Sequence, residues 1–116
     1  MKPEERKRLI LEKLEELSKQ AKVGGYVIVT EKNTNKYIQI SMITGEEKVL
    51  LEVPEAQLSK DEVAKISNIL REVPCEEEYI GLQMKVDKEA AVELIERIFR
   101  EGLGLPEDYE ITVEIS

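Results

Sequence analysis

The fold of this chain is decided by residues 36–73, which read KYIQISMITGEEKVLLEVPEAQLSKDEVAKISNILREV. Residues 37–43 and 48–53 are rich in β-branched and other apolar side chains, which predicts two strands joined by a short glycine-containing turn. Pro54 stops the second strand. Because side chains alternate along a strand, one face of the first strand is apolar and is expected to build the core: Ile38, Ile40 and Met42.

A capping box marks the start of the helix that follows. Ser59 precedes Glu62 by three residues, so each side chain can accept a backbone N–H that the first helical turn leaves unpaired. The predicted helix runs over 60–73 and ends before Pro74, which cannot continue it. Its apolar residues recur at spacings of three and four: Val63, Ile66, Ile69, Leu70 and Val73.

The segment before this stretch predicts a helix and a strand. An apolar stripe at helical spacing covers residues 3–22, and Gly24 or Gly25 is expected to cap the helix end. Residues 26–31 (YVIVTE) predict the first strand, and the two asparagines in 32–35 favour a hairpin turn.

The segment after it predicts a strand, a helix and a strand. Residues 79–86 alternate between apolar and other side chains, and Asp87 is placed to cap the next helix. Gly102 and Gly104 close that helix, and residues 109–115 alternate again as a last strand.

The resulting order, α-β-β-β-α-β-α-β, predicts an α+β fold. We expect a five-stranded, largely antiparallel sheet with helices packed mainly on one face. The length of 116 residues suits one domain, so residues 1–116 are predicted to form a single domain.

The charge balance argues against nucleic acid as a partner. The formal net charge is −8, whereas phosphate binding depends on lysine and arginine. The short basic run Arg6, Lys7 and Arg8 lies among glutamates, which indicates a solvated helix face of mixed charge. No apolar run long enough for a membrane span or a secretion signal is present, which favours a cytoplasmic protein. Abundant glutamate and lysine are also typical of proteins from hot environments.

No residue pattern predicts catalysis, a cofactor or a metal. The chain lacks histidine, the commonest general base and transition-metal ligand. Cys75, the one cysteine, precedes three glutamates (76–78) that oppose thiolate formation, so it is interpreted as an incidental or buried thiol. The many carboxylates are expected on helix surfaces, in loops or at outward strand positions, where they do no acid–base work. An oxygen-only magnesium or calcium site stays open, although no EF-hand spacing appears.

The second face of the sheet is the candidate binding surface. Tyr37, Ile43 and Leu50 are predicted to lie there, together with residues of the first strand, whose outward pair is either Tyr26 and Ile28 or Val27 and Val29. A partly apolar face with aromatic residues suits a dimer contact or a peptide-binding surface. The alternative is that these are scattered surface apolar residues, which are normal.

Several phrases resemble the TY-Chap domains, a group related to type III secretion chaperones and to the YbjN-like proteins. The similar phrases lie within about residues 25–115: Tyr37-Ile38-Gln39, Leu51-Glu52-Val53-Pro54, Leu58 to Val63, Val86 to Ala91, and Ile98 to Gly104. The chain departs from that group at Val73-Pro74-Cys75-Glu76, where its members often carry tryptophan or glycine, and in its highly charged first helix.

The resemblance implies a small acidic domain, usually dimeric, that holds an extended segment of another protein and supplies no catalytic residues. We therefore expect a non-enzymatic, chaperone-like protein that self-associates and binds a protein or peptide. The alternative is a small-molecule-binding or enzyme-accessory subunit whose site is completed by a partner chain.

Overall fold

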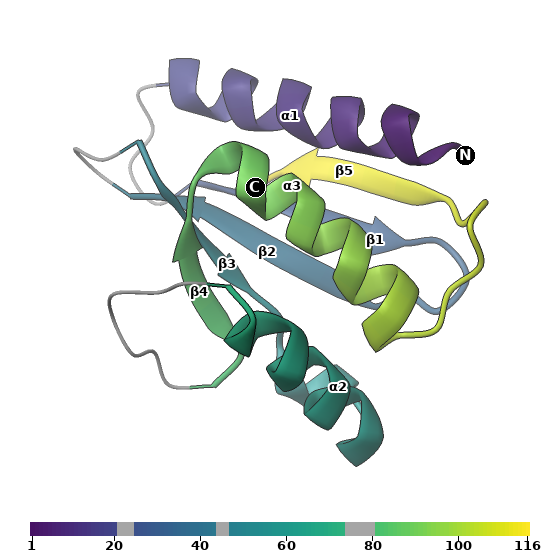
Figure 1. Cartoon of the computed structure of the whole chain (residues 1–116). Helices are drawn as coiled ribbons and strands as arrows, with labels where there is room; N and C mark the ends of the chain where they lie inside the picture. Colours follow the sequence, from purple (N-terminus) through teal and green to yellow (C-terminus); the bar gives the residue numbers. More distant parts are fainter. Residues whose placement is uncertain (21–24, 44–46, 74–80) are drawn as a thin grey trace.

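Five antiparallel strands form one open sheet, and the helices cover one of its faces (Figure 1). The computed structural model describes residues 1–20, 25–43, 47–73 and 81–116. The elements in chain order are α1 (Pro3–Lys19), β1 (Tyr26–Glu31), β2 (Tyr37–Met42), β3 (Val49–Glu52), the 3₁₀ turn η1 (Glu55–Gln57), α2 (Lys60–Arg71), β4 (Gln83–Val86), α3 (Lys88–Arg97), the π-helical turn η2 (Ile98–Gly102) and β5 (Ile111–Ile115). The predicted fold class and element order are confirmed.

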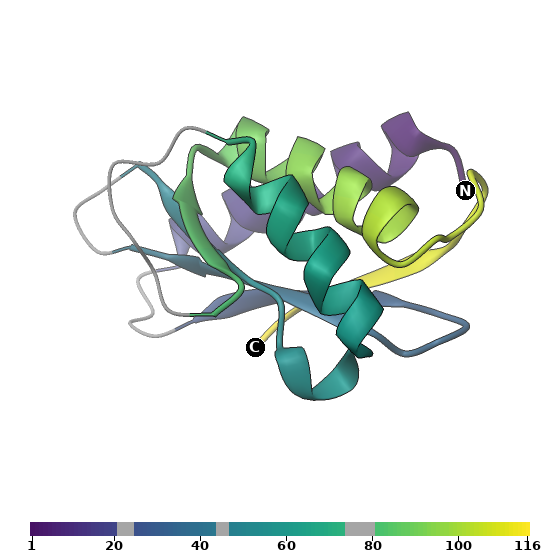
Figure 2. The ribbon, with the colours of Figure 1, turned by 60° about the horizontal axis from the view of Figure 1, so that its bottom comes forward.

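The strands lie in the order β4-β3-β2-β1-β5. The predicted meander β1-β2-β3 therefore forms the middle of the sheet, and the two later strands add one to each side. Helices α1 and α3 pack against each other over the sheet, with α1 above β1 and β5 (Figures 1 and 2). Helix α2 packs against η2 at the end of α3.

The core lies between the sheet and the helices. Every strand turns alternate residues toward it, as period-two alternation requires. The buried strand residues include Val27, Val29, Ile38, Ile40, Val49, Leu51, Met84 and Val86. The buried helix residues include Ile10, Leu14, Leu17, Ile66, Ile69, Leu70, Leu94, Ile95, Ile98 and Phe99. Met42, predicted in the core, is partly buried against it.

The capping box at the start of α2 is confirmed. The Glu62 backbone N–H donates to Ser59 Oγ at 3.2 Å, and the Ser59 backbone N–H donates to Glu62 Oε1 at 2.8 Å. Lys36, in the β1–β2 connection, donates to the same carboxylate at 2.6 Å. The hydrogen bonds from Lys36 and from the Ser59 backbone lower the pKa of Glu62, so this carboxylate joins the hairpin to α2 while ionised.

The predicted glycine cap of α1 is wrong in its position. The helix ends at Lys19 because Gln20 takes an extended conformation, with its N–H bonded to the Leu17 carbonyl. Gly25 lies directly before β1, and Gly24 lies outside the described residues. Asp87 does precede α3 in an extended conformation, but its side chain makes no capping hydrogen bond.

Some expectations fall outside the described residues. These are the glycine turn over 44–46, Cys75, the glutamates over 76–78, and the start of the predicted strand 79–86.

Candidate functional site

The outer face of the sheet, opposite the helices, is the candidate binding surface. In β1, Val27 and Val29 are buried, so Tyr26 and Ile28 point outward and decide between the two predicted alternatives. The strand register places Tyr26 opposite Ser41 of β2. Both outward side chains of β1 are partly exposed.

The predicted residues occupy different parts of this face. Leu50 of β3 and Tyr26 of β1 lie on either side of Ser41 of β2. The three residues therefore form one row across the sheet. Tyr37 lies opposite Thr30 at the far end of β2. All these side chains are partly exposed, as is Ile43, which follows the last residue of β2.

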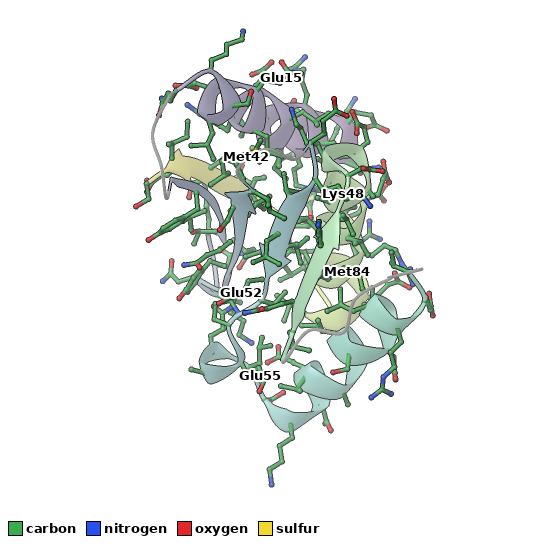
Figure 3. The ribbon with its side chains drawn as sticks, turned by 90° about the vertical axis from the view of Figure 1, so that its left-hand side faces the viewer. Glu15, Met42, Lys48, Glu52, Glu55 and Met84 are labelled. Carbon is green, nitrogen blue, oxygen red and sulfur yellow. The ribbon has the colours of Figure 1, made fainter. Side chains whose placement is uncertain are left out.

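The next row of the outer face is mostly polar, with Ile28 of β1 as its apolar member. Glu52 lies opposite Gln39 on one side and Gln83 on the other, and the Gln83 amide donates to its carboxylate at 2.9 Å. Figure 3 shows Glu52 and Glu55 at one end of the sheet and Met42 at the opposite end. The outward apolar side chains of β1 and β3 are therefore separated by Ser41 and Gln39 of β2, and the polar side chains gather around Glu52.

One side chain extends the sheet where the backbone cannot. Beyond Glu52, Pro54 lacks the N–H that a ladder needs. The Gln57 side chain takes the place of a peptide group: its carbonyl accepts from the Tyr37 N–H at 2.9 Å, and its amide donates to the Tyr37 carbonyl at 2.6 Å. This pair fixes η1 against the end of β2 and holds Tyr37 in place.

Arg6 contradicts the prediction of a solvated basic run. Its side chain is 1% exposed, and its guanidinium donates to both Glu96 oxygens of α3, at 3.1 and 2.6 Å. It also donates to the Tyr109 carbonyl at 3.0 Å and to the Met1 carbonyl. The guanidinium lies on the Tyr109 ring, 3.7 Å from its centre. Arg8 is exposed as predicted.

The Arg6–Glu96–Tyr109 cluster is fully paired. The Tyr109 hydroxyl donates to Glu96 at 2.7 Å. Burial raises the pKa of Tyr109, and the hydrogen bond to Glu96 adds to that rise. Burial alone would raise the pKa of Glu96, but the hydrogen bonds from Arg6 and Tyr109 outweigh it and leave the pKa below its ordinary value. A general acid needs the opposite shift, so the cluster is structural.

Glu31 is a second buried carboxylate that the sequence reasoning missed. It points to the helix side at the end of β1 and is 0% exposed. The Asn33 and Thr34 backbone N–H groups and the Thr34 hydroxyl donate to it at 2.6 to 3.0 Å. Burial would raise the pKa of Glu31, but these three hydrogen bonds lower it. The Glu31 carboxylate therefore stabilises the β1–β2 turn and is not assigned a role in acid–base catalysis.

A shallow cavity lies at the start of α1, beside the loop before β5. Its lining is mostly exposed acidic residues and the first residues of the chain: Met1, Lys2, Pro3, Glu5, Glu107, Asp108 and Glu110. Among the described residues, no three acidic, cysteine or histidine side chains are grouped so that they could hold a metal ion. The cavity has no convergent set of buried polar groups that would orient a small molecule.

Comparison with protein-family models, with curated proteins and with solved structures found no match. Over the described ranges, no helix has the length and apolar character needed to cross a membrane.

Proposed function

We propose that this protein is a non-enzymatic, chaperone-like protein that self-associates and binds an extended segment of another protein on the outer face of its sheet. The observation that carries the proposal is the set of outward apolar side chains on a sheet whose helices pack on the other side: Tyr26, Ile28 and Leu50. Aromatic and aliphatic side chains at the centre of a surface are typical of protein-binding sites.

The arrangement of the face suggests what the segment would contain. Apolar side chains would cover Tyr26 and Leu50, while Glu52 and the exposed Glu114 would favour lysine or arginine in the segment. Tyr37 extends the surface toward the η1 end, where Gln57 fixes its backbone. The resemblance to the secretion-chaperone group supports this proposal, as does the acidic net charge of −8.

The proposal is tested by suppression of the aggregation of a heat-denatured reporter enzyme, followed by light scattering. The wild type should reduce scattering. Tyr26→Glu and Leu50→Glu should lose most of that effect, because each replaces an apolar side chain of the outer face with a charge. Ala64→Glu is the matched control, since Ala64 is exposed on α2, away from the outer face. Equal suppression by all four proteins would refute the outer face as the binding surface.

A further inference from the structure

Strand β5 has a free edge, and the hydrogen bonds to β1 identify the groups on it. Tyr26 and Ser116 exchange both backbone hydrogen bonds, at 3.2 and 2.8 Å, so the groups of residues 112 and 114 also face β1. The N–H and C=O groups of Ile111, Val113 and Ile115 therefore point away from the sheet. Within the described ranges, none of these groups has a hydrogen-bond partner, and β5 is last in the strand order.

This edge lacks several of the features that protect edge strands, although Glu114 places one charged side chain on it. Natural proteins block such edges with lysine, proline, bulges or covering segments. The sequence of β5, ITVEI, contains neither lysine nor proline, and it pairs with β1 in regular register without a bulge. Val113 and Ile115 are only partly buried on the helix side, as is Leu9 of α1. The opposite edge strand, β4, carries Lys85.

We propose that β5 pairs antiparallel with β5 of a second copy, about a two-fold axis at Val113, to form one continuous sheet. Val113 would then exchange hydrogen bonds with Val113 of the second copy, and Ile111 with Ile115, giving about six backbone hydrogen bonds. The same pairing places the half-buried Val113 and Ile115 side chains in an apolar row across the junction.

The charges on β5 select this register. The free groups of the two edges face each other when the two-fold axis passes through a residue, because odd-numbered residues then pair with odd-numbered ones. Axes at 112, 113 and 114 are the ones that pair at least two of residues 111, 113 and 115. An axis at 112 would place Glu110 opposite Glu114, and an axis at 114 would place Glu114 opposite itself. The axis at Val113 instead places Thr112 opposite Glu114 and Glu110 opposite Ser116. Because like charges directly opposite are destabilising, the axis at Val113 is favoured over those at 112 and 114, since it alone of the three keeps the glutamate side chains from facing each other.

The proposal deepens the self-association part of the proposed function, and substitutions at the register positions test it. Both Thr112 and Glu114 are exposed, so changes there leave the core intact. Thr112→Glu should weaken the dimer by about tenfold, because symmetry creates two facing carboxylate pairs. Thr112→Lys should strengthen it, because each lysine would face Glu114. The dissociation constant is measured by sedimentation equilibrium of the full chain.

A pair of double variants separates register from net charge. Thr112→Glu/Glu114→Lys should restore the dimer, since residue 112 then faces a lysine. Thr112→Glu/Glu15→Lys has the same net charge as the first double variant, but its lysine replaces an exposed residue of α1. Its dimer should therefore stay as weak as that of Thr112→Glu. A monomeric wild type at its highest soluble concentration would overturn the proposal. A dissociation constant that Thr112→Glu leaves unchanged would also overturn it, as would equal recovery of the dimer in both double variants.

The outer-face variants keep the two proposals distinguishable. Tyr26→Glu should leave the β5 dimer intact even where it abolishes the suppression of aggregation, because the Tyr26 side chain lies on the outer face and the hydrogen bonds lie along the edge. Thr112→Glu could lose the dimer and still suppress aggregation of the reporter enzyme. That result would support the β5 dimer and refute only the idea that binding requires self-association.

Discussion

The Arg6 guanidinium lies 3.7 Å from the centre of the Tyr109 ring and donates a 3.0 Å hydrogen bond to the Tyr109 carbonyl, although 103 residues separate the two positions. Glu96 completes the contact from α3, since it accepts from both residues. Three elements distant in sequence therefore meet at one buried cation: α1, α3 and the segment that leads into β5. The cluster therefore joins α1 to α3 and to the segment before β5.

Replacing Arg6 should destabilise the protein strongly. Arg6→Met keeps much of the side-chain volume but leaves the partly buried Glu96 with only Arg100, at 4.0 Å, as a cation partner. Breaking a buried pair costs about 3–5 kcal/mol. The expected result is a decrease of about 3 kcal/mol in the free energy of unfolding, measured by urea titration. Arg8→Met, at an exposed position of the same helix, should change it by less than about 0.5 kcal/mol. Similar effects of the two substitutions would contradict a structural role for the cluster.

Tyr109→Phe tests the hydroxyl alone. The substitution keeps the ring under Arg6 and its tilted contact with Phe99, whose centre lies 5.4 Å away. Only the hydrogen bond to Glu96 is lost, so the free energy of unfolding should fall by about 1 to 1.5 kcal/mol. A loss as large as that of Arg6→Met would show that packing of the ring, and not the hydrogen bond, had been disturbed.

Stability should fall in acid because three carboxylates bind protons less readily in the folded chain. Glu31, Glu62 and Glu96 each have a pKa below 4.5, the ordinary value. Their contribution is therefore fully present above about pH 4.5 and is lost as the pH falls toward the folded-state values. Urea titrations at a series of pH values should show this decrease. Glu96→Gln should flatten the curve below pH 4.5, and Glu15→Gln, at an exposed position, is the control.

Most of the fold could be predicted because local signals agree with the global arrangement. The Ser59–Glu62 capping box and the alternation around Ile38 and Ile40 depend only on spacing, and both are confirmed. The end of α1 could not be predicted from its glycines, because a helix can also end where one residue turns extended, as Gln20 does.

The buried charges could not be predicted because their partners are distant in sequence. Arg6 reads as one member of a basic run, and its burial follows only from the meeting of Glu96 and Tyr109 in three dimensions. Its spacing offered one signal: Arg6 lies four residues before Ile10, on the apolar stripe of α1. The outward side of β1 was undecidable from β1 alone, since Tyr26 and Val27 begin two equally apolar alternating rows.

The Gln57 side chain should control the stability of the far end of β2. Gln57→Glu keeps the acceptor for the Tyr37 N–H but removes the donor, so a carboxylate oxygen would face the Tyr37 carbonyl. The expected loss in the free energy of unfolding is about 1–3 kcal/mol, because the part-buried Tyr37 carbonyl is left unpaired. Hydrogen exchange of the Tyr37 amide should become faster in Gln57→Ala, while exchange of the Ile40 amide, farther along β2, changes less. Unchanged exchange of the Tyr37 amide would contradict a stabilising role for the two Gln57–Tyr37 hydrogen bonds.

Gly102 allows α2 and η2 to pack closely, and this contact should not tolerate a methyl group. A Cβ at Gly102 would lie 2.7 Å from Ile66 Cγ1, well inside van der Waals contact. Gly102→Ala should therefore cost about 1–3 kcal/mol, the usual effect of overpacking a core. Ile66→Ala removes the opposing atom, so the cost of Gly102→Ala should largely vanish in that background, as measured by a double-mutant cycle.

Gly104 provides the contrast, because it has open space around it but a φ of +68°. Gly104→Ala should therefore be destabilising by the same amount in both backgrounds, about 1 kcal/mol. If the cost of Gly102→Ala were also independent of Ile66, the π-helical backbone and not the close contact would require glycine there.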